Sequence, residues 1–147
     1  MGFTVDLVTG LAEYLAAGGV GEWNADLAAN PSGDQVAIVV GPNLPQTPDR
    51  VVCLTPYPLV DEPGMSEVTV GVQVRCRGTV DPRVAEDLAD AVYDRLHGAT
   101  QLTLGAVPVA QVWRASSAVL GPDSNHRHER SDNYYLQANR DAPHATD

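Results

Sequence analysis

Apolar residues recur along this chain with two periods, one typical of helices and one typical of strands. Over residues 4–17 they follow helical spacing, with Thr4 available as the N-cap. Asp81 followed by Pro82 is a strong helix-start signal, and the apolar positions after it continue to a stop at Gly98. The pattern therefore predicts two amphipathic helices.

Strand-like segments occupy much of the remaining chain. In the clearest of them, apolar residues from Val68 to Cys76 alternate with polar ones, so one face is expected to be buried and the other polar. Residues 34–41 form a β-branched run that suits a strand covered on both faces. The expected strands are 34–41, 50–57, 68–77, 107–115 and 131–139.

The order of these elements predicts the fold class. Because most strands are neighbours in the sequence, we expect an α+β fold, with a mostly antiparallel mixed sheet of about five strands packed against two main helices. Residues 21–33 are a connection that holds a short helical turn around 25–29. A length of 147 residues suits one domain, here residues 1–140, followed by a flexible tail at 141–147.

Charge and composition exclude several classes of protein. The formal net charge is −10, and all 9 basic residues are arginine, so no lysine is available for a Schiff base or a phosphate-binding loop. Such an acidic chain is a poor candidate for holding nucleic acid. The apolar runs are far shorter than the roughly 20 residues of a membrane span. The chain start has no secretory pattern, and Cys53 and Cys76 suit reduced core positions, so we expect a cytoplasmic protein.

No group of residues in the sequence has the pattern of a catalytic centre. His126 and His128 offer two imidazoles, whereas catalytic zinc normally takes three protein ligands. Ser116 and Ser117 lack a nucleophile-elbow pattern, and Cys53 has apolar neighbours that raise a thiol pKa. We therefore expect no enzyme activity, no metal and no cofactor.

Charged residues gather in separate places. The exposed side of the second helix carries Glu86, Asp87, Asp90 and Asp94. Asp61 and Glu62 lie in an acidic loop at 59–66, while Arg75 and Arg77 share the polar face of the strand 68–77. Opposite charges on different faces suit head-to-tail association of identical subunits, although a solvated surface shows the same pattern.

Three segments in this order and spacing resemble the tail terminator proteins of long-tailed, non-contractile phages, often called minor capsid proteins. The segments are residues 48–58, 70–78 and 81–98. In that family an Asp- and Arg-containing loop precedes a late strand with an Asn-aromatic step. Residues 123–130 and Asn133 followed by Tyr134 match this feature. The resemblance extends over about residues 4–140.

The resemblance implies a ring, in that family a hexamer, that caps the tail tube, ends its polymerisation and helps to join the tail to the head. The implied partners are further copies of the chain, the tail tube protein and a head-completion protein, with duplex DNA passing through unbound. The place implied is the neck of the virion, with the host cytoplasm during assembly.

Within such a ring, Arg75 and Arg77 are subunit-interface candidates that face Asp61 and Glu62 of a neighbour. Arg127 and Arg130, in the polar loop 121–130, are further interface candidates. The acidic helix residues are candidates for lining the lumen, because an acidic lumen repels duplex DNA. These candidates are Glu86, Asp87, Asp90 and Asp94.

Two other interpretations remain open from the sequence. One is a different neck connector, such as a head-completion or tail-completion subunit, because these proteins share the size, acidity and α+β character of this chain. The other is a small metal-dependent hydrolase that uses His126 and His128.

Overall fold

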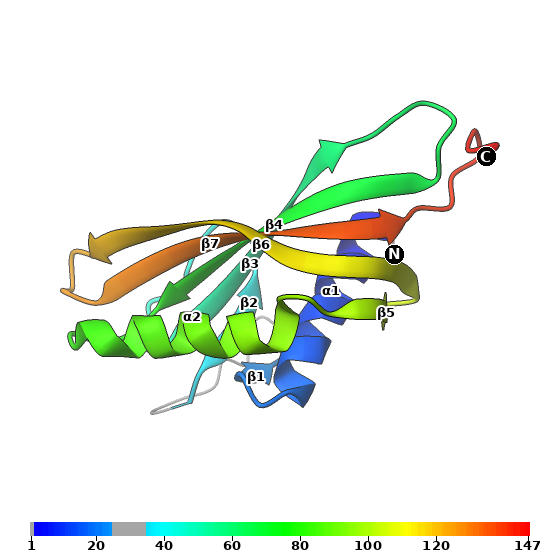
Figure 1. Ribbon diagram of the computed structural model, residues 1–147. Coiled ribbons are helices and arrows are strands. Elements are labelled where there is room, and N and C mark those ends of the chain that lie inside the picture. The colour runs from blue at the N-terminus through cyan, green and yellow to red at the C-terminus, as the bar shows by residue number, and fades with distance from the viewer. Residues whose placement is uncertain (1, 25–34) are drawn as a thin grey trace.

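The structure is a computed structural model that describes residues 2–24 and 35–147. Within this part of the chain, two helices lie beside one curled sheet (Figure 1). The elements are α1 (Phe3–Ala17), β1 (Glu22–Trp23), β2 (Ala37–Val40), β3 (Val51–Val60), β4 (Glu67–Arg77), α2 (Pro82–Leu96), β5 (Thr100–Leu104), β6 (Val107–Pro122) and β7 (His128–Asn139). The expected helical turn at 25–29 lies outside the described residues.

The sheet confirms the α+β class but has more strands than expected. Its order is β1-β2-β3-β4-β7-β6-β5, so it contains seven strands rather than about five. β1 and β2, and β2 and β3, pair in parallel, while the other neighbours are antiparallel. The sequence did not predict β1 and β5 as strands, because both are short and gain their pairing from neighbours in the sheet.

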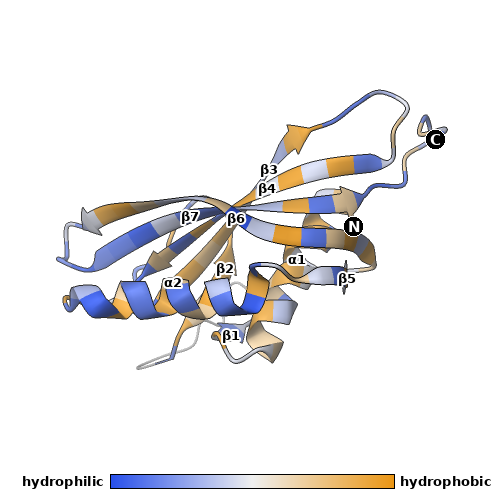
Figure 2. Cartoon of the chain, viewed as in Figure 1, coloured by the Kyte–Doolittle hydropathy of each residue, from blue (hydrophilic) through white to orange (hydrophobic). Residues whose placement is uncertain are grey.

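Both helices cover the same face of the sheet. The alternating apolar residues of β4 from Val68 to Cys76 are buried, as predicted, and they join buried residues of α1 and α2 in one core. Arg77, expected on the polar face of this strand, is buried as well. Leu7 and Leu11 of α1 and Leu96 of α2 have no exposed surface. Figure 2 shows the same alternation as apolar and polar bands along the strands, with a hydrophilic outer face on α2.

A second, smaller apolar cluster lies on the opposite face of the sheet. Ala37, Val51 and Cys53 are buried there, and Val39 and Leu44 pack against them. Leu44 belongs to the loop 41–50, which therefore covers the outer face of β2 and β3. The predicted strand at 34–41, expected to be covered on both faces, corresponds to β2. The prediction is confirmed for the first half of β2, where Ala37 and Ile38 are both buried.

The last two strands are longer than their sequence patterns indicated. β6 continues to Pro122 and β7 begins at His128, so the expected loop 121–130 is reduced to a short turn. β6 contains three register irregularities, between Val109 and Gln111, between Arg114 and Ser116, and between Val119 and Gly121. These bulges break the alternation of apolar and polar residues, which explains why the pattern ended early.

Residues 141–147, expected to be a flexible tail, contact the turn between β3 and β4. The Asp147 carboxylate accepts hydrogen bonds from the backbone N–H and the hydroxyl of Ser66, at 3.1 and 2.9 Å. The Thr146 N–H donates to the Gly64 carbonyl at 2.9 Å. The C-terminus therefore lies beside this turn in the folded chain.

The helix starts agree with prediction for one helix and differ for the other. α1 begins at Phe3 with Gly2 as N-cap and no side-chain cap, so Thr4 lies inside the helix. α2 begins as predicted, since the Asp81 carboxylate accepts from the Arg83 N–H at 3.0 Å. The Arg83 guanidinium pairs with the same Asp81 carboxylate at 2.8 Å.

Capping of α2 by Asp81 makes stability depend on pH. Hydrogen bonds from the Arg83 side chain and N–H lower the pKa of Asp81 from 3.8 to about 2. A carboxylate with a lowered pKa stabilises the fold above its unfolded pKa and loses this effect as the pH falls through the folded pKa. We expect Asp81→Ala to destabilise the chain at neutral pH, and the deficit against wild type to shrink as the pH falls from 3.8 towards 2.

Urea denaturation at a series of pH values measures this deficit. Asp87→Ala is the control, since it removes an equal charge from the exposed side of α2 without removing a cap. A deficit for Asp81→Ala that stays constant across this pH range would contradict the capping role.

The Tyr134 hydroxyl is the one buried side-chain polar group without a hydrogen-bond partner in the described part of the chain. Tyr134 itself has no exposed surface. Since an unpaired buried hydroxyl costs free energy, Tyr134→Phe should leave the free energy of unfolding unchanged or raise it by up to about 1 kcal/mol. The control, Tyr57→Phe, removes a hydroxyl that donates to Asn133 at 2.9 Å, and should lower stability in the same urea titration. A clear loss of stability in Tyr134→Phe would show that its hydroxyl has a partner.

Candidate functional site

The polar residues considered for catalysis do not come together. No group of three or more His, Cys, Asp or Glu that could hold a metal occurs among the described residues. The Ser117 hydroxyl donates to Asp132 at 2.6 Å, and the Ser116 hydroxyl accepts from the Asn133 amide at 3.0 Å. The two serines therefore bond to partners other than a histidine base.

Both cysteines are free and buried. Burial raises the pKa of the Cys53 thiol and of the Cys76 thiol, which disfavours the reactive thiolate. The prediction that they are reduced core residues agrees with this placement. Neither thiol has the electropositive, accessible surroundings that activate a nucleophile.

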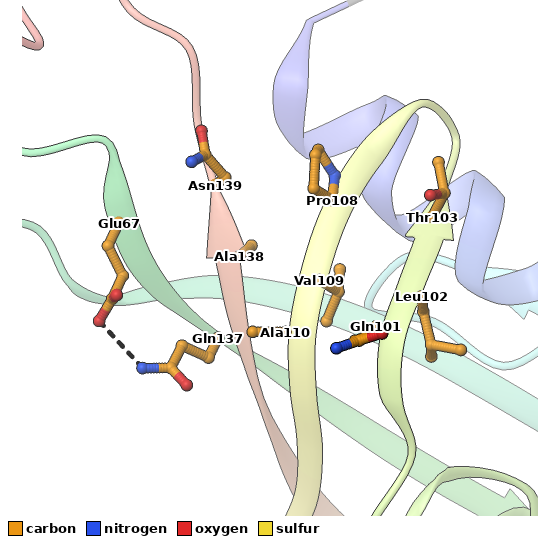
Figure 3. A pocket seen from close by; sticks show the side chains of 10 residues that line it. All are labelled: Glu67, Gln101, Leu102, Thr103, Pro108, Val109, Ala110, Gln137, Ala138 and Asn139. Carbon is orange, nitrogen blue, oxygen red and sulfur yellow. Dashed lines mark hydrogen bonds between the residues drawn. The ribbon is translucent and has the colours of Figure 1, made fainter.

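An open pocket of about 440 Å³ lies where β5, β6 and β7 meet, on the sheet face opposite the helices (Figure 3). Its only charged lining residue is Glu67, whose carboxylate accepts a hydrogen bond from the Gln137 amide at 2.9 Å. Apolar and amide side chains such as Val109 and Gln101 make up the rest. The pocket offers neither a paired acid and base nor a set of metal ligands.

Two of the predicted interface arginines hold the loop 41–50. Arg77 is 3% exposed, and its guanidinium donates to the carbonyls of Pro45, Pro48 and Asp49 at 2.6, 2.8 and 2.9 Å. Burial lowers the pKa of Arg77, and the nearby positive charge of Arg127 adds to the decrease.

Arg127 binds the same loop from the turn between β6 and β7. Its guanidinium donates to the Gln46 carbonyl at 2.7 Å and pairs with Asp123 at 3.0 Å. Arg127 is 6% exposed. The two arginines therefore hold the loop 41–50 against the sheet, one from the end of β4 and one from the β6–β7 turn.

The other two predicted interface arginines form ion pairs within the chain. Arg75 pairs with the buried Glu129 on the neighbouring strand at 2.6 Å. Arg130 connects the sheet to α2, since it pairs with Glu86 at 2.6 Å and with Asp132 at 3.0 Å. A role for these arginines between subunits stays a prediction, and the structure shows which internal ion pairs would compete with it.

The acidic residues predicted to line a lumen lie along one side of α2. Asp87, Asp90 and Asp94 are exposed, whereas Glu86 is partly covered and tied to Arg130. This face of the helix points away from the sheet (Figure 2). It presents a line of hydrated carboxylates.

Exposed apolar side chains gather at both ends of the sheet. At one end, the β3–β4 turn patch comprises Leu59, Val60 and Met65, which are 40%, 49% and 45% exposed. Asp61 and Glu62 lie between them and are also exposed. At the opposite end, Val119 and Leu120 of β6 are 74% and 49% exposed.

The β6–β7 and β3–β4 hairpins project from these opposite ends (Figure 1). The register requires this arrangement, because the start of β4 pairs with the end of β7 and the end of β4 with the start of β7. The described surfaces thus consist of apolar ends, an acidic helix face and a polar sheet face. Exposed apolar patches of this kind are typical of subunits that assemble with other proteins.

The comparison with protein families identifies which assembly subunit this is. The family model of the bacteriophage tail terminator protein matches residues 14–140, so the chain belongs to this family. The resemblance inferred from the sequence is therefore confirmed. The family is one of structural phage proteins, and the chain is a structural protein of the phage virion. No curated protein matches the chain.

Sequence reasoning missed the exposed apolar ends and concentrated on charge. One signal was present: residues 115–120, Ala-Ser-Ser-Ala-Val-Leu, contain neither a charge nor a proline next to a predicted strand. The β3–β4 turn patch carried a weaker signal, because Leu59 and Val60 precede an acidic loop whose polarity suggested solvent.

Proposed function

We propose that this chain caps the phage tail tube as a closed ring of identical copies and ends tube polymerisation. The observation that carries the proposal is the family match, which spans residues 14–140 and so includes nearly every element of the fold. The mechanism is steric: a ring bound to the last tube subunits covers the edge onto which further subunits would add. The other face of the ring forms part of the junction with the head.

The distribution of surfaces supports ring formation. A closed ring needs two different patches on each subunit, so that one patch meets the other on the next copy. This chain has exposed apolar residues at both ends of its sheet, on the β3–β4 turn patch and on β6. Exposed apolar patches on a small domain are typical of interaction sites.

The charge of the chain supports the passage of DNA without binding. Every copy carries a formal net charge of −10, and α2 presents three exposed aspartates on one side. We propose that this side of α2 faces the lumen, where like charge repels the duplex and limits its adhesion. Glu86 completes the acidic line, although its carboxylate also pairs with Arg130.

Adding the purified chain to polymerising tail tubes tests the proposal. If the chain is the terminator, tubes stop growing at lengths that shorten as the chain is added earlier, and negative-stain images show extra density at one end of each tube. Asp87→Ala combined with Asp90→Ala should leave capping intact, since the lumen face does not contact the tube.

Two results would contradict the proposal. Tube lengths that do not respond to the added chain would remove the capping role. Attachment to DNA-filled heads in the absence of tails would instead identify a head-completion subunit, the main alternative among neck proteins.

A further inference from the structure

The outer half of β6 is an open sheet edge. β5 pairs with β6 only as far as Gln111, and beyond Arg114 no described strand lies on this side of β6. All residues from Ala115 to Leu120 are exposed, on both faces of the hairpin. We call this segment, residues 115–120, the β6 edge.

The hydrogen-bond directions identify which backbone groups of the β6 edge are open. The His128 carbonyl accepts from the Gly78 N–H and the His128 N–H donates to the Thr79 carbonyl, so the backbone groups of His128 point towards β4. Because backbone groups alternate in direction along a strand, those of even-numbered β7 residues point towards β4 and those of odd-numbered residues towards β6. Ser131 and Asn133 pair with Ala118 and Ser116, whose backbone groups therefore point inward. The backbone N–H and C=O groups of Ser117 and Val119 therefore point away from β7, and no described residue pairs with them.

The other long open edge of this sheet is closed to strand pairing. β2 pairs with β3 only as far as Leu54, whose carbonyl accepts from Gly41 and so points to the open side. With a period of two, Pro56 and Pro58 point to the same side and have no N–H to offer. Proline at such positions protects an edge against pairing, whereas the β6 edge has neither proline nor charge.

The β6 edge is also held in place from behind. The Ser117 hydroxyl bonds to Asp132, and Arg130 joins Asp132 to Glu86 of α2. The β6–β7 hairpin is therefore anchored to α2, although α2 leaves its outer strand exposed. An ordered edge with exposed valine and leucine is suited to a preformed interface.

The chain itself carries a matching surface. The β3–β4 turn patch is apolar like the β6 edge and lies at the opposite end of the sheet. Two such turns would repel each other, because Asp61, Glu62, Glu67 and the adjoining Asp147 outnumber the one arginine beside the turn, Arg140. Within residues 107–139 three arginines balance three acidic residues, so the β6–β7 hairpin has no such repulsion towards an acidic turn.

We infer that the β6 edge of one copy binds the β3–β4 turn patch of the next copy. Val119 and Leu120 pack against Leu59, Val60 and Met65, and the neighbour covers the open backbone of the edge. Because the two patches differ, the contact is head-to-tail and can repeat around a ring. This inference rests on the proposed ring and names the two surfaces that close it.

Disulfide trapping between variants that each carry one added, exposed cysteine tests the contact. Val119→Cys and Val60→Cys are prepared separately, mixed, oxidised and resolved by non-reducing gel electrophoresis. The natural Cys53 and Cys76 are each 1% exposed and give little background. We expect a mixed dimer from the mixture and at most traces from either variant alone. The double variant should form a ladder of higher species.

Val80→Cys is the matched control. Val80 is 68% exposed and follows β4, so β7 lies between it and the β6 edge. Mixing Val80→Cys with Val60→Cys should yield no mixed dimer. Three results would overturn the inference: a Val119→Cys dimer formed by that variant alone, no mixed dimer at the highest soluble concentration, or equal trapping with the control.

The Val119→Asp variant separates failure of the inference from failure of the proposed function. Val119 is largely exposed, so the variant should keep the wild-type circular dichroism spectrum and lose tube capping. If wild type caps tubes and Val119→Asp caps them equally well, the inference is wrong and the proposed function stands. If the Val119→Cys and Val60→Cys variants form the mixed dimer yet wild type never caps tubes, the proposed function is wrong and the contact stands.

Discussion

Replacing Arg77 with methionine is expected to lower the free energy of unfolding by about 3 kcal/mol, because three loop carbonyls lose a charged donor. Methionine keeps much of the apolar volume of the arginine stem, so the change isolates the polar contribution. Arg77 is 3% exposed and donates to Pro45, Pro48 and Asp49. Some of these carbonyls regain a water partner, which keeps the loss below the sum of three charged hydrogen bonds.

Urea denaturation followed by circular dichroism measures the loss, and limited trypsin digestion locates it. Release of the loop 41–50 should speed cleavage after Arg50, which ends that loop. The control is Arg83→Met, since the Arg83 side chain is 86% exposed and pairs only with the exposed Asp81. An Arg77→Met variant as stable as the control would show that the loop does not depend on the buried guanidinium.

This result also bears on the sequence-based view of Arg77 as an interface residue. A charge reversal at Arg77 would release the loop and destabilise the fold, so failure of such a variant to form rings would not identify an interface. Val119→Asp and Val60→Asp are better probes, because both valines are exposed and have no buried polar partner to lose.

Gly10→Ala is the second substitution with a large expected effect, and its sign is opposite to that of helix propensity. In a helix interior, alanine in place of glycine ordinarily gains about 1 kcal/mol. Here a Cβ at Gly10 would overlap the backbone of Leu104 and Gly105, in the turn between β5 and β6. We expect a net loss of about 2 to 3 kcal/mol, because backbone on both sides must move to admit one methyl group.

Thr4→Ala is the matched control, since Thr4 is exposed in the first turn of α1 and alanine there gains propensity without a new contact. Thermal and urea denaturation of the two variants should shift in opposite directions. A Gly10→Ala variant more stable than wild type would show that α1 and the β5–β6 turn are not in close contact. Gly105 has the same constraint from its side, because its own Cβ would overlap the backbone of Asp6.

Local chemistry made several elements predictable from the sequence. Asp81 and Pro82 supply the cap and the first residue of α2. The period of two in β4 places one set of side chains in the core in any sheet that buries that face. Because these signals involve residues that are close in the sequence, they can be recognised without knowledge of the fold.

Other elements depend on partners far along the chain. β5 and the outer part of β6 lack a continuous alternating pattern, and the bulges in β6 shift the register against β7. β1 has only two residues and exists as a strand because β2 lies beside it. Neither the neighbouring strand nor the bulge can be recognised in the sequence, so the predicted strand count, the predicted end of β6 and the predicted start of β7 were wrong.

The sequence by itself determined the α+β class, both helices, the apolar face of the sheet and, through motif order and spacing, the tail terminator family. Only the tertiary structure decided what each charge and each apolar residue does. Arg77 alternates like Arg75, yet it is buried because the loop 41–50 folds over it. Residues 115–120 form an exposed edge because β5 begins only at Thr100, opposite Gln111, and does not cover them, and this depends on contacts between segments that are distant in sequence.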